Sequence, residues 1–211
     1  MTDSRETILQ RIRAGLGPSG DPAPGYAAIP REYTRASRLD TEARLHLFLE
    51  RLRDYDTNVV ESDAASVPET ILTILRGGSQ KKVIVADGLP AHLLPAGFRF
   101  LPEGQATVGD LDDCDGIVTL CTVAIAWTGT IGLTHGPGEG ARRLTLLPDR
   151  HLCIVRAEQV VETVPEAIER LGSSATPLLT LISGPSATAD IEMTRIRGVH
   201  GPRLLDVVLV R

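Results

Sequence analysis

The sequence of 211 residues contains few aromatic residues and few cysteines. One Trp, three Tyr and three Phe make up 3% of the chain, which leaves little to stack against a flavin, and no glycine fingerprint of a dinucleotide-binding turn occurs. The cysteines, Cys114, Cys121 and Cys153, are too few and too widely spaced for an iron–sulfur cluster, a zinc site or a disulfide framework. We therefore expect free thiols, no metal site and no cofactor in this chain.

An excess of positive charge and a long apolar run are also missing. The net charge is −5 and the pI about 5.6, so the chain has no basic field to attract nucleic acid. No run of 18 apolar residues occurs, and the start, MTDSRETILQ, lacks the basic and apolar regions of a signal peptide. With 42% hydrophobic and 23% charged residues, we predict a globular, cytoplasmic protein without a membrane span.

The N-terminal part differs from the rest of the chain. The spacing of Ile8, Leu9 and Ile12 after Asp3 predicts a helix over residues 4–15. Residues 17–30 are so rich in Gly and Pro that they predict a linker without periodic structure. We expect residues 1–38 to be a helical appendage that matters for association with a partner, and residues 39–211 to be the main domain.

Helix and strand patterns alternate after residue 39. Three helices are expected: one over 40–55, one from the capping-box pair Ser66 and Glu69 to Gly77, and one over 157–171 with Val160, Val161, Val164 and Ile168 inward. Strands are expected at 58–60, 82–87, 116–119, 151–156, 178–182 and 204–210, with a hairpin over 122–134. This order predicts an α/β fold in which helices cover both faces of a mainly parallel sheet.

Small and polar residues gather in three stretches, 128–130, 135–143 and 183–202. Ligands of open α/β sheets bind at the carboxyl ends of the strands, and we expect these stretches to meet there. Glycines let the backbone approach a ligand, while hydroxyls and a guanidinium can hold an anion. The candidate ligand-binding residues are Thr128, Gly129, Thr130, Gly138, Gly140, Arg142, Ser183, Gly184, Ser186, Thr188, Asp190 and His200. The middle stretch, HGPGEGARR, matches no phosphate-loop motif. A flexible, solvated loop that follows the hairpin is therefore as good an interpretation of it as a ligand-binding loop.

Other interpretations exist for individual residues. Asp190 is equally suited to cap a short helix carrying Ile191, Met193 and Ile196. His200 can serve as a base for a nucleophilic serine only if its turn folds back onto Ser183 or Ser186, and no GxSxG elbow supports this. We therefore favour ligand binding over catalysis in this stretch and assign no catalytic residue. His151, on an apolar strand, is interpreted as a core histidine.

Three segments together resemble the LUD-domain proteins: AIAWTGTIGL (124–133), GPGEGARRLTLLPDRHLCIV (136–155) and SGPSATADIEMTRIRGVHGPRLLDVVLV (183–210). The likeness covers most of residues 40–211 and is most specific in the last segment. It implies a fold like that of the ribose-5-phosphate isomerase, glucosamine-6-phosphate deaminase and CoA-transferase group. It also implies a role in oxidising L-lactate to pyruvate beside iron–sulfur partner proteins. The family usually carries an acidic residue before Thr-Gly-Thr, where this chain has Trp127.

Three functions are compatible with these observations. The first is an accessory or substrate-handling subunit of an L-lactate utilization system, which binds a small carboxylate or phosphate while its iron–sulfur partners hold the redox centres. The second, by analogy of fold alone, is an independent enzyme that acts on a phosphorylated or CoA-linked substrate. The third is a structural interaction module. The missing cluster ligands favour the first.

Overall fold

The computed structural model describes residues 4–17, 22–172, 178–188, 196–198 and 201–211, which belong to two compact units, Met1–Thr34 and Arg35–Arg211. The first unit contains α1 (Ser4–Leu16), which confirms the expected helix, and α2 (Pro22–Ala27). The prediction that 17–30 lacks periodic structure is wrong at α2, because prolines are tolerated in the first turn of a helix, where an N–H has no intrahelical partner. No residue of α1 is buried. The division into 1–38 and 39–211 stays a prediction.

The larger sheet of the described residues has six strands, all parallel, in the order β1–β12–β7–β4–β2–β3. These strands are β1 (Asn58–Ser62), β2 (Val83–Val85), β3 (Phe100–Pro102), β4 (Gly116–Thr119), β7 (Arg150–Arg156) and β12 (Leu204–Val210). Continuous apolar runs such as LLDVVLV in β12 are typical of parallel strands that are buried on both faces. The mainly parallel α/β sheet is thereby confirmed.

Helices cover both faces of the larger sheet. On one face lies α4 (Val67–Gly77), which buries Val67, Ile71 and Leu75. On the other lie α5 (Val108–Asp112) and α3 (Thr41–Asp54), which buries Leu45, Phe48, Leu49 and Leu52. Asp40 caps α3 by accepting a hydrogen bond of 2.8 Å from the Ala43 amide, as its position before the apolar pattern predicts. None of the described helices has the length and apolar character that crossing a bilayer requires.

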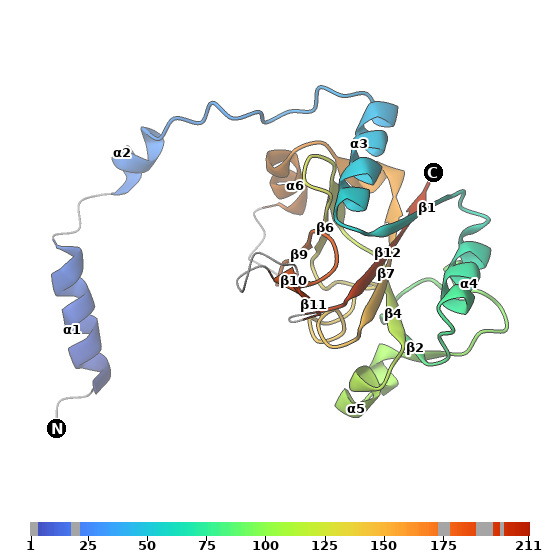
Figure 1. Ribbon diagram of the computed structural model, residues 1–211. Coiled ribbons are helices and arrows are strands. Elements are labelled where there is room, and N and C mark those ends of the chain that lie inside the picture. Colours follow the sequence, from blue (N-terminus) through green and yellow to red (C-terminus); the bar gives the residue numbers. More distant parts are fainter. Residues whose placement is uncertain (1–3, 18–21, 173–177, 189–195, 199–200) are drawn as a thin grey trace. The chain divides into compact units, whose positions relative to one another are not determined.

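A smaller mixed sheet, which the sequence did not predict, lies on the α3 face (Figure 1). Its order is β8–β5–β6–β9, with β5 (Val123–Ile125), β6 (Thr130–Leu133), β8 (Val160–Val161) and β9 (Thr180–Ile182). The strands β5 and β6 form the expected antiparallel hairpin. Ile131 and Leu133 share a core with Cys153 and Leu205 of the larger sheet, while α6 (Val164–Leu171) packs on the outer side through Ala167. The chain therefore places one sheet face to face with another.

One expected cap and one expected helix boundary are wrong. The α4 helix begins after Ser66 and ends at Gly77, as expected, but Ser66 makes no side-chain cap; Asp63 instead accepts hydrogen bonds from the amides of Ala65 and Ser66. The expected helix over 157–171 begins only after Thr163, because residues 157–161 form a 3₁₀ turn, η3 (Ala157–Gln159), and β8. Val160 is buried in that strand, but Val164 and Ile168, which we expected inward, are 40% and 62% exposed. Adjacent β-branched residues such as Val160 and Val161 favour a strand.

The remaining elements are short. The sequence did not predict β3, α5 or the 3₁₀ turns η1 (Ala91–Leu93) and η2 (Glu103–Gln105). A two-stranded hairpin consists of β10 (Ala187–Thr188) and β11 (Ile196–Arg197), with Thr188 opposite Ile196. The expected short helix is therefore wrong at Ile196, and Ile191 and Met193 lie outside the described residues.

Candidate ligand-binding site

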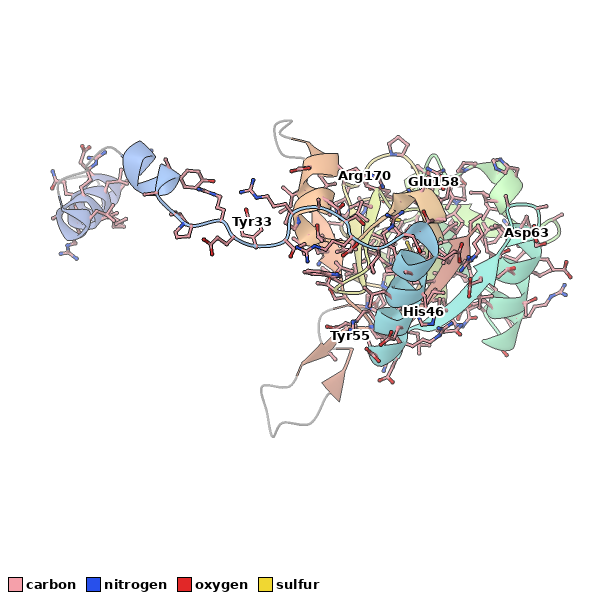
Figure 2. All side chains as sticks on the ribbon, turned by 90° about the horizontal axis from the view of Figure 1, so that it is seen from above. Tyr33, His46, Tyr55, Asp63, Glu158 and Arg170 are labelled. Carbon is pink, nitrogen blue, oxygen red and sulfur yellow. The ribbon has the colours of Figure 1, made fainter. Side chains whose placement is uncertain are left out.

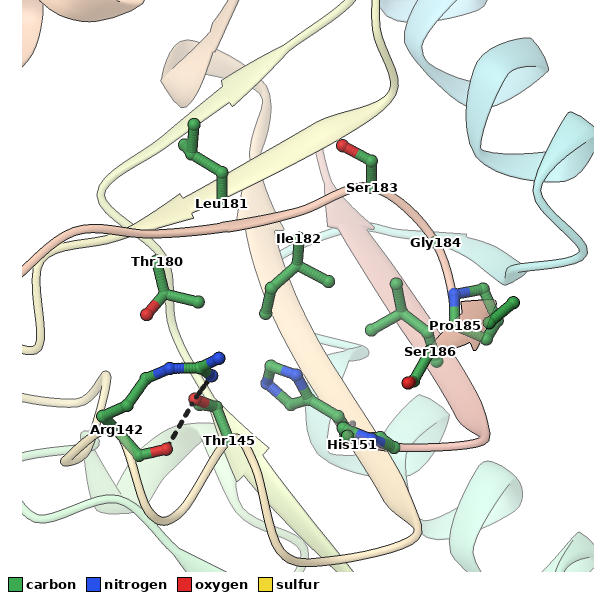
Figure 3. A pocket seen from close by; sticks show the side chains of 14 residues that line it. Arg142, Thr145, His151, Thr180, Leu181, Ile182, Ser183, Gly184, Pro185 and Ser186 are labelled. Carbon is green, nitrogen blue, oxygen red and sulfur yellow. Dashed lines mark hydrogen bonds between the residues drawn. The ribbon is translucent and has the colours of Figure 1, made fainter. Parts of the chain in front are cut away.

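A cavity of about 250 Å³ lies between the two sheets, where β9 and the chain after it cross the larger sheet (Figure 3). The larger sheet contributes His151 and Leu205, the second residues of β7 and β12. The complete lining consists of Arg142, Thr145, His151, Thr180, Leu181, Ile182, Ser183, Gly184, Pro185, Ser186, Ala187, Gly201, Pro202 and Leu205. Sites for drug-sized ligands usually measure about 300–1,000 Å³, so this cavity suits a smaller molecule.

The segment 183–187 is fixed by its backbone. The Ser186 amide donates to the Pro202 carbonyl at 2.8 Å, and the Ser186 carbonyl accepts from the Gly198 amide at 2.9 Å. Gly184 has a φ of +82°, and a Cβ on it would lie 2.5 Å from the Cβ of Tyr55, the residue that ends α3. Figure 2 shows Tyr55 at this end of the helix. Only glycine fits there, so this wall of the cavity is set by contact with α3.

Arg142 supplies the positive charge of the cavity. The loop before it is held by two buried carboxylates: Glu139 accepts from the Thr134 amide at 2.6 Å, and Glu103 accepts from the Ala141 amide at 2.9 Å. The Arg142 guanidinium donates to the Thr145 hydroxyl at 3.2 Å. No carboxylate of the described residues forms an ion pair with Arg142. Its charge is therefore available to an anion in the cavity.

Three hydroxyls form a chain that reaches the cavity from the hairpin. Thr128 and Thr130 lie 2.7 Å apart, oxygen to oxygen, and Thr130 lies 2.8 Å from the Ser183 hydroxyl. Thr130 is buried and neither threonine lines the cavity. Gly129, at a φ of +56°, packs against the Arg51 backbone of α3. The 128–130 stretch therefore positions Ser183 and does not itself face the cavity.

His151 is the residue that the sequence interpretation undervalued. It is fully buried, its Nε2 lies 2.7 Å from the Thr119 hydroxyl, and its Nδ1 has no hydrogen-bond partner among the described residues. Burial lowers the pKa of His151 to about 4. A histidine on a buried strand is compatible with a core role, but this ring also lines the cavity. The available clue was one polar residue in the apolar run HLCIV.

The glycine-rich loop lines a second cavity at the carboxyl ends of the strands. Gly138 bridges the chain after β2 and β4: its amide donates to the Asp87 carbonyl, and its carbonyl accepts from the Leu120 amide, both at 2.7 Å. Gly140 and Arg142 line this cavity of about 460 Å³, together with Arg143. Arg142 thus borders both cavities. We expected all three stretches at the carboxyl edge; the 183–187 segment instead crosses the amino-terminal residues of β7 and β12, because β9 carries it over the sheet face.

His135, which lines the second cavity, is hydrogen-bonded to a residue that lines the first. Its Nδ1 lies 2.7 Å from the Gly140 carbonyl, and its Nε2 lies 2.7 Å from the Thr180 hydroxyl. Because a carbonyl only accepts, Nδ1 carries the proton and Nε2 accepts from Thr180. Both ring nitrogens are therefore used in holding the loop to β9.

Of the last three predicted residues, Thr188 lies in β10 and does not line the cavity. Asp190 and His200 lie outside the described residues. Within the described ranges, no group of three His, Cys, Asp or Glu side chains is arranged to hold a metal ion. All three cysteines are buried, and a hydrogen bond with Cys153, together with burial, raises the pKa of Cys121, which keeps that thiol protonated.

Comparison with known proteins identifies the family. The model of the LUD domain matches residues 32–210. The chain belongs to the LUD-domain family. "Lactate utilization protein C" of Deinococcus radiodurans is 40% identical over 97% of this chain and 92% of the relative, and the protein of that name from Halalkalibacterium halodurans is 26% identical over 96% and 95%. The crystal structure of a "duf162 family protein" from D. radiodurans matches with a TM-score of 0.71 and 38% identity, covering 82% of this chain and 99% of that one.

This LUD-domain protein has Trp127 at the position where the resemblance implies an acidic residue. Glu162, at the end of β8, is nevertheless its neighbour, because the Trp127 amide donates to the Glu162 carbonyl at 3.1 Å. Burial opposes ionisation of Glu162, but hydrogen bonds from the Leu39 amide, the Ser37 hydroxyl, the Arg38 amide and Trp127 outweigh it and lower the pKa of Glu162. Within the second unit, these donors hold residues 37–39 against the end of β8. Glu162 therefore has a structural role that is filled by this chain's own groups.

Proposed function

We propose that this chain is an accessory or substrate-handling subunit of an L-lactate utilization system and that it binds a small anion, a carboxylate or phosphate, in the cavity between its two sheets. The observation that carries the proposal is Arg142, a guanidinium that faces a cavity of about 250 Å³ and has no carboxylate partner among the described residues. The name of two relatives, lactate utilization protein C, supports the biological setting.

The lining of the cavity is suited to a small anion. Ser183, Ser186, Thr145 and Thr180 line it, while Leu181, Ile182 and Leu205 provide apolar contact. The Thr145 hydroxyl already donates to the Arg142 carbonyl and the Thr180 hydroxyl to His135, so the charged donor for a ligand is the Arg142 guanidinium. A charge-assisted hydrogen bond to an ionised ligand contributes about 1.5–3 kcal/mol. Because Arg142 is the charged side chain of this lining, we expect it to contribute most of the affinity.

Binding of anions to single-residue variants tests the proposal. The Arg142→Ala variant should bind L-lactate, pyruvate or inorganic phosphate at least about tenfold more weakly in isothermal titration calorimetry, because one charge-assisted bond is lost. The matched control is Arg143→Ala, since Arg143 is adjacent in sequence but lines only the second cavity. Equal loss in both variants, or no binding by the unmodified chain, would overturn the assignment of this cavity.

We further propose that the partners of this chain are iron–sulfur proteins and that the chain holds no cofactor of its own. We place this assembly in the cytoplasm. The purified chain should then be colourless and free of stoichiometric iron or zinc, whereas a tagged chain purified from cells at its native level should bring along proteins with the absorption of iron–sulfur clusters. A visible band that stays with the isolated chain through gel filtration would contradict this distribution of roles.

An independent enzyme on a phosphorylated or CoA-linked substrate is the alternative. A cavity of about 250 Å³ accommodates a small anion far better than a CoA ester, which favours the accessory role. Turnover of an acyl-CoA or a phosphosugar by the isolated chain would reverse that preference.

A further inference from the structure

His151 lines the cavity and carries an unsatisfied polar atom. The residue is fully buried, and within the described part of the chain its Nδ1 has no hydrogen-bond partner. Figure 3 shows the His151 ring and the Arg142 guanidinium facing the same space, with Ile182 pointing toward it. Buried polar groups in folded proteins nearly always have a partner, so this atom indicates one that enters the cavity.

The neighbour of the ring decides which hydrogen-bonding role is left for Nδ1. The buried Thr119 hydroxyl lies 2.7 Å from Nε2, and among the described residues it has no other hydrogen-bond partner. If Nε2 carried the ring proton, the hydroxyl proton of Thr119 would be buried without an acceptor. When Thr119 donates to Nε2, both groups are satisfied and the ring proton lies on Nδ1. Nδ1 is therefore a donor without a partner in the described residues, on a ring that lines the cavity.

The two donors of the cavity differ in charge. Burial holds the pKa of His151 at about 4, so the ring is neutral at physiological pH. Arg142 carries a full charge and a planar set of donors that matches a carboxylate. A guanidinium beside a neutral N–H is complementary to a ligand that has both an anionic group and a further oxygen outside that group. The guanidinium can bind the anionic group, and the N–H can donate to the further oxygen.

We propose that His151 contacts the ligand directly, with Nδ1–H donating to an oxygen outside the anionic group while Arg142 binds that group. The ligand class is then a small carboxylate with a hydroxyl or keto oxygen on its carbon chain. This inference rests on the proposed function, because it uses the same cavity, and it adds a residue that selects among anions.

Three probes that differ in one oxygen test the selection: L-lactate, pyruvate and propanoate. The unmodified chain should bind L-lactate or pyruvate at least about fivefold more tightly than propanoate, the range expected for one neutral hydrogen bond. His151→Leu should abolish this preference while propanoate still binds. His151→Asn has nearly the same size as the leucine variant but places an amide donor near the position of Nδ1, so it should restore part of the preference.

A measurement on the unmodified protein keeps the test independent of how well the variants fold. In a ¹⁵N-histidine-labelled sample, long-range ¹H–¹⁵N correlation should give His151 as the Nδ1–H tautomer, and L-lactate or pyruvate should shift its Nδ1 resonance while propanoate does not. If the unmodified chain binds all three equally, or if the preference persists in His151→Leu, the role of His151 is refuted and the anion site stands. If none of the three nor phosphate binds, the proposed function itself fails.

Discussion

Lowering the pH should destabilise this protein through His151. The ring is fully buried, and burial lowers its pKa from 6.5 to about 4. In the unfolded chain the ring takes up a proton near pH 6.5, whereas in the folded chain it stays neutral until about pH 4. Between these values the unfolded state binds more protons, so stability falls as the pH falls. The contribution is complete above pH 6.5 and is lost by about pH 4.

The size of the effect follows from the difference in pKa. Each pKa unit corresponds to about 1.4 kcal/mol, so a shift from 6.5 to about 4 amounts to roughly 3 kcal/mol. That is a large share of the 5–15 kcal/mol that typically separates folded from unfolded domains. Acid lability of this magnitude is readily measured.

Urea unfolding at a series of pH values isolates the contribution of His151. The difference in unfolding free energy between the unmodified chain and His151→Leu should change by roughly 3 kcal/mol between about pH 7 and about pH 4, because the variant lacks the titrating ring. His92→Gln is the control, since His92 lies exposed in η1 and its removal should leave the pH dependence unchanged. Parallel curves for the unmodified chain and His151→Leu would refute the argument.

Two further predictions concern stability. Asp206→Ala should lower the unfolding free energy by about 3–5 kcal/mol in denaturant titrations, because it leaves Arg150 without the buried partner that it binds at 2.6 and 2.9 Å. The comparison is the double variant Arg150→Met/Asp206→Leu. A smaller loss of unfolding free energy in Asp206→Ala than in the double variant would contradict this prediction. Deleting residues 1–34 should leave the thermal midpoint of the second unit unchanged, whereas deleting residues 1–39 should cost about 2 kcal/mol, because Glu162 loses the donors of 37–39. Equal midpoints after both deletions would show that these bonds are unimportant.

The sequence predicted elements whose signal is local. The α3 helix follows from four apolar residues on one face behind the Asp40 cap, and the central strands follow from β-branched runs between turn residues. The start of α6 could also have been predicted from the sequence, because Thr163 and Glu166 form a capping box with Pro165 in the first turn. The valines before it were nevertheless assigned to the same helix, because their spacing also fits a helical face.

The second sheet was beyond local patterns. Pairing of β8 with β5 and of β9 with β6 joins residues that are far apart in the chain, and strands of two or three residues carry little periodic signal. The candidate site was predicted in part for the same reason. Arg142, Ser183, Gly184 and Ser186 share one cavity, but His151 joins them only because strand register puts it opposite Leu205 and beneath β9.

The buried acids of the second unit explain why the cavity between the sheets is positive. Glu103, Glu139, Glu162 and Asp206 are all buried, and each is satisfied by amides, hydroxyls or an arginine of this chain. None of these four lines that cavity. An ionised carboxylate inside it would repel an anion and pair with Arg142, so the placement of the acids in structural roles is what leaves the guanidinium exposed to a ligand. The same argument predicts that introducing a carboxylate, as in Ser186→Asp, would abolish anion binding more completely than Ser186→Ala.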